Sequence, residues 1–153
     1  MKLSTRVRYG CRAMIDLALH AGQEPVALEV LAREQRIPER YLAKIVQDLR
    51  RSGLIRSVRG AHGGYRLSRP ATQITLLEVW EALEGAFCPV DCVDAPASCR
   101  KARQCITREV WEELRDVVTK TMQAKTLAGL ARRHREKAKR RARLERERPG
   151  GDG

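Results

Sequence analysis

The fold is decided by RIPERYLAKIVQDLRRSGLIRSVRGAHGGYRLSR, residues 36–69. The first half of this stretch repeats apolar side chains at helical spacing, which predicts a helix from Pro38 to about Ser52 with one buried face. The apolar positions are Leu42, Ile45, Val46 and Leu49. The opposite face is polar and mostly basic, and it carries Arg40, Lys44, Gln47 and Arg51. Pro38 suits the first turn of a helix, because its missing N–H needs no partner there.

The second half of the stretch predicts a β-hairpin. Residues 54–58 and 65–68 have strand character, and the connection between them contains three glycines. Upstream, residues 26–35 predict a further short helix that ends at Arg36 and Ile37. Two helices joined by a short turn, the second one basic outside, form a helix-turn-helix. A hairpin directly after that pair makes it a winged helix.

The remaining elements extend this unit on both sides. A helix is expected over residues 9–20, with Ser4 or Thr5 as its N-cap, and a short amphipathic helix over residues 76–84. Residues 107–124 predict a long helix whose apolar positions are Val110, Trp111, Leu114, Val117, Val118 and Met122. One small domain cannot cover all of this surface, so we expect a partner helix from a second subunit.

The sequence therefore predicts a mainly α protein with a small β-wing. A winged helix-turn-helix domain would occupy residues 1–70, and a cysteine loop with a dimerisation helix would occupy residues 71–131. Residues 132–153 form a basic tail, expected to be a solvated helix or disordered and to end at Pro149.

Charge and composition point to a nucleic-acid partner. The chain has 153 residues and a formal net charge of +12. Residues 40–69 carry eight Lys and Arg against a single acidic residue, and residues 70–99 carry five acidic residues and no Lys or Arg. No apolar run approaches the roughly 18–20 residues that span a bilayer, and charged residues interrupt the N-terminus. We expect a cytoplasmic protein that binds double-stranded DNA rather than a membrane.

The candidate DNA contacts lie on the basic helix and on the wing. Basic side chains release counterions from phosphates, and Arg or Lys on a helix in the major groove reads base edges, most often guanine. Arg59 at the wing tip is placed to enter the minor groove, because Gly60, Gly63 and Gly64 permit close backbone approach. His62 is expected at the wing surface. The full candidate set is Arg40, Tyr41, Lys44, Gln47, Arg51, Arg59, Gly60 and His62.

Four of the five cysteines fall within 18 residues, with three, six and five residues between them. They are Cys88, Cys92, Cys99 and Cys105. Disulfides are disfavoured in the cytoplasm, and thiolates in a loop suit an iron–sulfur cluster or zinc. Zinc sites usually pair their ligands as CxxC, which this segment lacks, and this favours iron–sulfur without deciding the matter. Cys11 is expected in the core.

The chain resembles the IscR/NsrR-type family of winged-helix transcription regulators over about residues 1–131. The segments that carry the resemblance are MKLSTRVRYG, LRRSGLI, VRGAHGGYRL, ITLLEVWEALEG and, after the cysteines, ITREVWEEL. The resemblance implies a homodimer on palindromic promoter DNA. It also implies a cluster held by Cys92, Cys99 and Cys105 that senses iron, nitric oxide or redox state, with [2Fe–2S] placed ahead of [4Fe–4S].

The chain departs from the family at the fourth ligand. Some members have a His three residues after the last cysteine, where this chain has Arg108, a cation that cannot ligate iron. Others recruit an acidic residue from the partner's first helix, where this chain offers Arg8 and Arg12. The choice stays open, with Cys88 first and Asp91 or Asp94 second.

Three other functions remain open on the sequence alone. The cysteines would also suit a cluster-free thiol or persulfide sensor, or a structural zinc site. A small metalloenzyme is disfavoured, because the sequence offers no His/Glu pairing, activated nucleophile or phosphate loop. Its histidines, His20, His62 and His134, are scattered along the chain. We therefore expect no enzyme activity and no small-molecule substrate.

Overall fold

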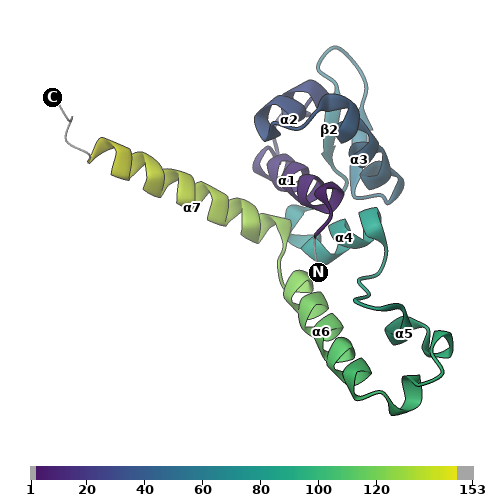
Figure 1. Ribbon diagram of the computed structural model, residues 1–153. Helices are drawn as coiled ribbons and strands as arrows, with labels where there is room; N and C mark the ends of the chain where they lie inside the picture. The colour runs from purple at the N-terminus through teal and green to yellow at the C-terminus, as the bar shows by residue number, and fades with distance from the viewer. Residues whose placement is uncertain (1–2, 148–153) are drawn as a thin grey trace.

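The computed structural model describes residues 3–147 and confirms the expected fold class (Figure 1). The α-helices are α1 (Thr5–Leu19), α2 (Leu28–Gln35), α3 (Glu39–Arg51), α4 (Leu76–Glu84), α5 (Asp91–Asp94), α6 (Ile106–Gln123) and α7 (Leu127–Arg146). Two strands, β1 (Ile55–Val58) and β2 (Gly64–Leu67), form the wing. Short 3₁₀ turns are η1 (Ala71–Gln73), η2 (Pro96–Ser98) and η3 (Ala102–Gln104). Helices α1–α4 and the wing form a head, from which α6 and α7 leave in different directions (Figure 1).

Helix boundaries differ from the sequence prediction for local reasons. Helix α1 begins at Thr5 rather than at residue 9, because the Val7 N–H donates to Ser4 Oγ (3.1 Å) and caps the helix. Helix α2 begins at Leu28 rather than Val26, because Val26 pairs instead with Tyr65 of β2. Pro38 is the N-cap of α3 and not a residue of its first turn.

The core of the head is made by the predicted face of α3 together with α1, α2 and α4. Leu42, Ile45, Val46 and Leu49 are all buried. Helices α1 and α4 cross closely at Gly10, where a Cβ would lie only 2.3 Å from Leu83 Cδ1. Any larger residue at position 10 would therefore require the Leu83 side chain to move.

The wing is an antiparallel hairpin in which Ile55 pairs with Leu67 and Val58 with Gly64. It is fixed to the head by the Val26–Tyr65 bridge, whose two N–H···O bonds measure 2.9 and 2.8 Å. Gly64 has a φ of +154°, and a Cβ there would lie 2.4 Å from the Val26 carbonyl oxygen. The glycine is therefore required by the seating of the wing on the head.

The segment between the last two helices is joined to the head by main-chain hydrogen bonds. The Leu76 N–H donates to the Lys125 carbonyl (2.8 Å), and the Leu127 N–H donates to the Ile74 carbonyl (2.9 Å). Thr126 caps α7 by accepting from the Gly129 N–H (3.2 Å). From this cap α7 runs for 20 residues, into the stretch expected to be a solvated helix or disordered. We call this junction of residues 74–76 with 125–127 the clamp.

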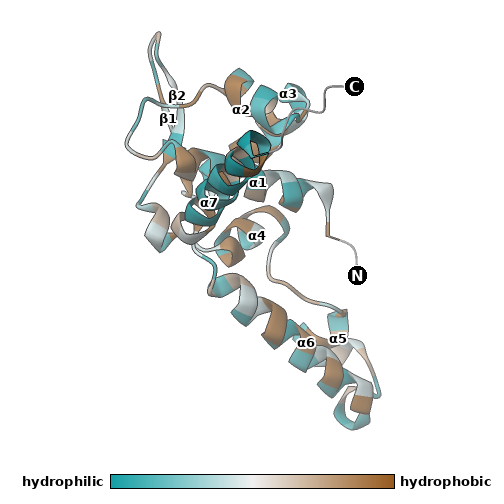
Figure 2. Ribbon diagram, turned by 90° about the vertical axis from the view of Figure 1, so that its left-hand side faces the viewer, coloured by the Kyte–Doolittle hydropathy of each residue, from teal (hydrophilic) through white to brown (hydrophobic). Residues whose placement is uncertain are grey.

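The basic tail is helical as far as the structure describes it. Leu127 and Ala131 pack into the head, and every residue of α7 beyond Ala131 is exposed. Figure 2 shows α7 as mostly hydrophilic. The expected end at Pro149 lies outside the described residues. The division of the chain at residues 70 and 131 stays a prediction.

Candidate nucleic-acid interface and cysteine loop

The predicted DNA-contacting side chains of α3 lie on its exposed face. Arg40, Lys44, Gln47 and Arg51 are exposed, opposite the buried face of the same helix. The structure gathers Arg40, Tyr41 and Lys44 around one open groove, completed by Thr5, Tyr9 and Pro38. This groove faces outward from the head and concentrates positive charge beside two aromatic rings.

Tyr41 is held at the edge of this surface by another aromatic ring. It is 38% exposed, and its ring meets Tyr9 of α1 edge to face, with 5.9 Å between centroids. The guanidinium of Arg12 lies over the Tyr9 ring, 5.7 Å from its centroid. Tyr41 is thus both a packing residue and part of the exposed face, and this contact with Tyr9 was not foreseen from the sequence.

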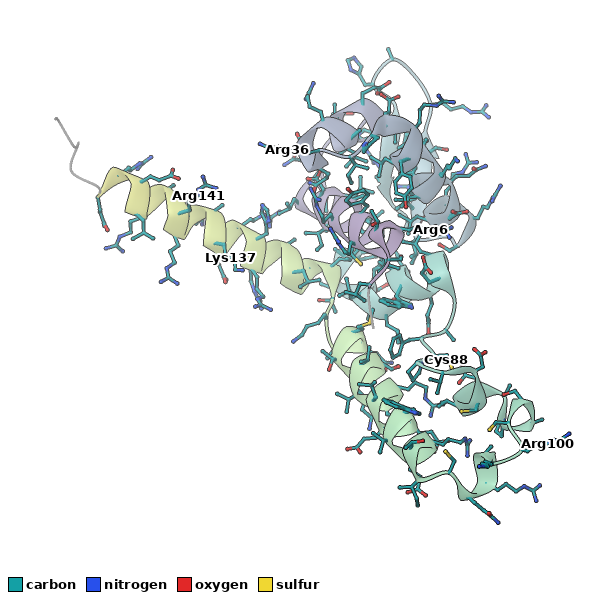
Figure 3. The ribbon with its side chains drawn as sticks, viewed as in Figure 1. Arg6, Arg36, Cys88, Arg100, Lys137 and Arg141 are labelled. Atoms are coloured by element: carbon teal, nitrogen blue, oxygen red, sulfur yellow. The ribbon has the colours of Figure 1, made fainter. Side chains whose placement is uncertain are left out.

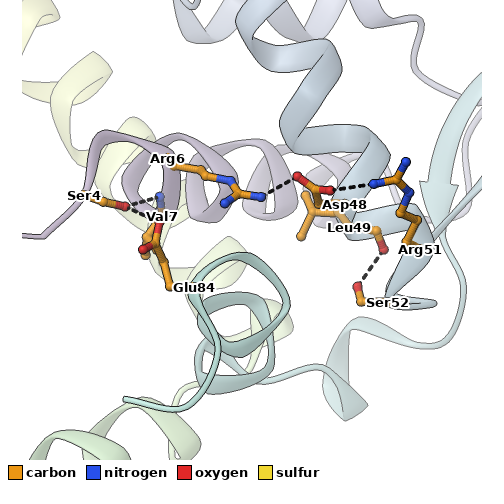
Figure 4. A network of polar contacts seen from close by, with 8 residues as sticks. All are labelled: Ser4, Arg6, Val7, Asp48, Leu49, Arg51, Ser52 and Glu84. Carbon is orange, nitrogen blue, oxygen red and sulfur yellow. Dashed lines mark hydrogen bonds and ion pairs between the residues drawn. The ribbon is translucent and has the colours of Figure 1, made fainter. Parts of the chain in front are cut away.

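An acidic residue organises the other end of α3 (Figure 4). Asp48 accepts from Arg6 of α1 and pairs with Arg51, whose Nη1 lies 3.4 Å from Asp48 Oδ1. Arg51 keeps 67% of its side chain exposed while it is held in this way. Sequence reasoning missed this network, although Asp48 is the single acidic residue within residues 40–69.

The wing tip carries Arg59, Gly60 and His62, all of them exposed. Gly60 has a φ of +117° and a Cβ there would meet no atom within 4 Å, so its surroundings are open. Gly63 is different, because a Cβ would lie 2.4 Å from the Val58 carbonyl oxygen. Contacts within the wing therefore explain why residue 63 is glycine, and contact with Val26 explains Gly64. Of the three glycines, only Gly60 leaves open space for an approaching DNA backbone.

The cysteine loop, residues 86–105, links α4 to α6 (Figure 3). Cys92 lies in α5, Cys99 follows η2, and Cys105 is the N-cap of α6. Cys99 is exposed, and Cys88, Cys92 and Cys105 are half-buried. Within residues 3–147, the sulfur and carboxylate groups of the loop do not gather into a set of three within 4.8 Å of one another.

Arginines of α6 hold the loop. Arg108 donates from Nε to the Cys92 carbonyl (2.9 Å) and forms an ion pair with Glu112 (2.7 Å). Arg115 Nη1 lies 3.4 Å from Asp94 Oδ1. In the sequence, Arg108 stands out only because some family members have a His ligand at this position. In the structure, Arg108 links α5 to α6.

The loop cysteines differ in acidity. A hydrogen bond with the Thr107 side chain, followed by the Arg108 N–H, lowers the pKa of Cys105. Partial burial, followed by a hydrogen bond with Asp94, raises the pKa of Cys88. The donor set fits an iron–sulfur cluster chemically, because three or four thiolates lie on one segment. Holding a cluster would require the loop to draw its sulfurs together.

Burial separates Cys11 from these four residues. It packs against the core of the head, and burial raises the pKa of Cys11 to about 11. The expectation that Cys11 belongs to the core is in accord with this position. None of the helices in the described part of the chain is long and apolar enough to cross a membrane.

Comparison with known proteins agrees with this architecture. Residues 3–133 match the model of the Rrf2 family, described as an iron-dependent transcriptional regulator. The chain is 39% identical over 132 residues to protein rrf2 of Nitratidesulfovibrio vulgaris, covering 86% of this chain and 88% of that protein.

Two solved structures are similar in both sequence and fold. The structure of CymR, the global cysteine regulator of B. subtilis, has a TM-score of 0.73 at 37% identity, covering 86% of this chain and 96% of that one. The IscR structure of T. potens has a TM-score of 0.74 at 34% identity, covering 88% of each chain. These relatives are transcription regulators and carry the same winged helix. The chain therefore belongs to the Rrf2 family of transcriptional regulators.

Proposed function

We propose that the chain acts in the cytoplasm as a homodimer on a palindromic promoter site, and that an iron–sulfur cluster held by the cysteine loop controls this binding. The observation that carries the proposal is the position of the loop. It connects α4, which packs on α1 and α3, to the N-terminal end of α6. A change in the loop therefore acts directly between the DNA-reading head and the helix assigned to dimerisation.

The dimer is supported by the exposed apolar side chains of α6. No side chain of this helix is buried in the single chain. Ile106, Val110 and Val117 are 71%, 51% and 54% exposed. These positions repeat at intervals of four and seven residues, so they form one stripe along α6. A second copy of α6 would cover this stripe and would place two heads on one DNA duplex.

On the DNA, α3 of each protomer would enter a major groove, with the two grooves about 34 Å apart. Arg40, Lys44 and Gln47 would reach base edges from the exposed face of α3. Arg51, held by Asp48, would contact phosphate. In the wing, Arg59 would reach the minor groove beside Gly60, and His62 would lie at the wing surface.

In the loop, Cys92, Cys99 and Cys105 would hold the cluster, with Cys88 as fourth ligand ahead of Asp91 or Asp94. When bound, the cluster supplies a centre that responds to iron supply, nitric oxide or redox state, and we place [2Fe–2S] ahead of [4Fe–4S]. The protein's own part is transmission. Arg108 and Arg115 tie α5 to α6, so an ordered loop fixes one end of α6.

A second candidate function is cluster-free thiol sensing. It is favoured by the separation of the loop sulfurs, because no three of them gather within 4.8 Å in residues 3–147. It is also favoured by the similarity to CymR, which is described as a global cysteine regulator. In this case oxidation or persulfide formation at the loop cysteines would replace cluster binding as the signal.

Anaerobic purification separates these candidates. The proposal expects brown or red protein that contains iron and sulfide, and a colourless Cys92→Ala/Cys99→Ala/Cys105→Ala variant. A Cys11→Ala variant is the matched control and should keep the colour, because Cys11 packs against the core of the head and not in the loop. Colourless wild-type protein without metal would refute the cluster and favour thiol sensing. Zinc without sulfide would indicate a structural zinc site.

Control of DNA binding needs its own measurement. The affinity of the wild type and of the triple variant is compared by anaerobic fluorescence anisotropy on specific promoter fragments. The proposal expects the affinities to differ on at least one site. Equal affinities on every specific site would refute coupling between the loop and the DNA-reading head.

A further inference from the structure

A buried carboxylate lies in the head, and it belongs neither to the residues assigned to DNA contact nor to the cysteine loop. Asp16 of α1 is 4% exposed and is the single buried charged side chain in the described part of the chain. Its Oδ2 atom is buried and has no hydrogen-bond partner. Burial of a carboxylate oxygen without a partner is costly, and a bound cation would compensate this cost.

Two further metal-ligating side chains lie beside this carboxylate. His20 follows one turn later on α1, with Nδ1 3.6 Å from Asp16 Oδ1 and 3.0 Å from the Asp16 carbonyl oxygen. Glu34 comes from α2 and is exposed. One ligand atom of each residue lies within 4.8 Å of the other two. The sequence shows no motif that pairs His20 with Glu34, and the two side chains come together only because α2 packs on α1.

We propose that Asp16, His20 and Glu34 form a binding site for a divalent first-row transition-metal ion. Two carboxylates and a neutral imidazole supply two negative charges, which balance the charge of such an ion. Oxygen and imidazole donors suit Mn²⁺, Fe²⁺ and Zn²⁺, whereas thiolates select softer centres. The set is therefore chemically distinct from the cysteine loop.

The geometry requires only a small contraction. Donor atoms bound to one ion at about 2.1 Å in a tetrahedral site lie roughly 3.4 Å from one another. In the structure the three ligand atoms lie within 4.8 Å of one another, so they would have to move closer together. Glu34 can supply this movement, because its side chain is exposed while Asp16 is fixed in the core. Water would complete the coordination. The ion would join α1 to α2, the first helix of the helix-turn-helix.

The test uses Mn²⁺ alone as the probe, added to the full-length chain. Electron paramagnetic resonance of the free aqua ion measures how much Mn²⁺ is bound during a titration. We expect saturable binding of about one Mn²⁺ per chain, weakened at least tenfold by Glu34→Gln and by His20→Gln. Saturating Mn²⁺ should also raise the Tm of the wild type by several degrees, because an ion that binds only the folded state stabilises it.

Two controls separate this site from other sources of binding. Glu29→Gln changes another exposed carboxylate on α2 and should leave Mn²⁺ binding unchanged. The triple cysteine variant should also bind normally, because the site contains no thiolate. Binding that does not saturate below about 1 mM would overturn the proposal. So would equal binding in the Glu34→Gln variant, or loss of binding in the triple cysteine variant.

Discussion

Replacing Val110 and Val117 of α6 by alanine should weaken dimerisation strongly. The two valines are 51% and 54% exposed in the single chain, and each substitution removes two methyl groups. Burial of one such carbon is worth about 0.8 kcal/mol, so covering a half-exposed methyl group gains about 0.4 kcal/mol. Across both protomers eight methyl groups are lost, which corresponds to about 3 kcal/mol, or roughly a 100-fold rise in the dimer Kd.

Sedimentation equilibrium over a range of protein concentrations measures this Kd directly. Alanine has a higher helix propensity than valine, so the double variant should keep its helix content, which circular dichroism verifies. Leu144→Ala is the matched control, because Leu144 is 55% exposed on α7 and lies outside the α6 stripe. If the double variant dimerises within about threefold of the wild type, the α6 stripe is not the interface.

Three further changes test the wing, the DNA contacts and the thiols. Gly64→Ala should cost at least about 2 kcal/mol in thermal unfolding, because its Cβ would meet the Val26 carbonyl, whereas Gly22→Ala, with no atom within 4 Å, should cost about half as much. Arg59→Ala should weaken binding by about 1–3 kcal/mol at its own operator in fluorescence anisotropy if it reads bases, and a uniform loss across sequences would make it a phosphate contact. With a pKa of about 11, Cys11 should alkylate about 100-fold more slowly at pH 8 than a thiol of pKa 9.0, because less of it is thiolate. Mass spectrometry after iodoacetamide treatment checks this, and similar rates in native and unfolded protein would contradict it.

The head was predictable because its decisive signals are local in sequence. The apolar repeat of α3 specifies its buried face, and the glycine-rich connection specifies the wing. The errors occurred where a distant residue changes a local preference. Val26 has a helical context in the sequence, but Tyr65, far along the chain, recruits it into a β-bridge. The local helix or strand propensity of Val26 does not predict its pairing with a residue far along the chain.

The site residues divide in the same way. The exposed face of α3 follows from helical periodicity, so Arg40, Lys44 and Gln47 could be placed in advance. The hydrogen bond from Arg108 to the Cys92 carbonyl could not be predicted, because it depends on how α5 packs against α6. The set of Asp16, His20 and Glu34 had only a partial signal. Its first two members are spaced i, i+4, but Glu34 joins them only when α2 packs on α1.

The two ends of α6 are held in different ways, and because of this difference the cysteine loop affects only the N-terminal end of the helix. At the C-terminal end, the clamp joins α6 to the core by main-chain hydrogen bonds, which do not depend on the cysteine side chains. At the N-terminal end, about 27 Å away, α6 is held through Cys105, Arg108 and the loop. In the proposed function, a chemical change in the loop would release one end while the clamp still fixes the other. In the proposed homodimer, the resulting tilt would alter the angle between the two heads, and it would need no rearrangement inside either head.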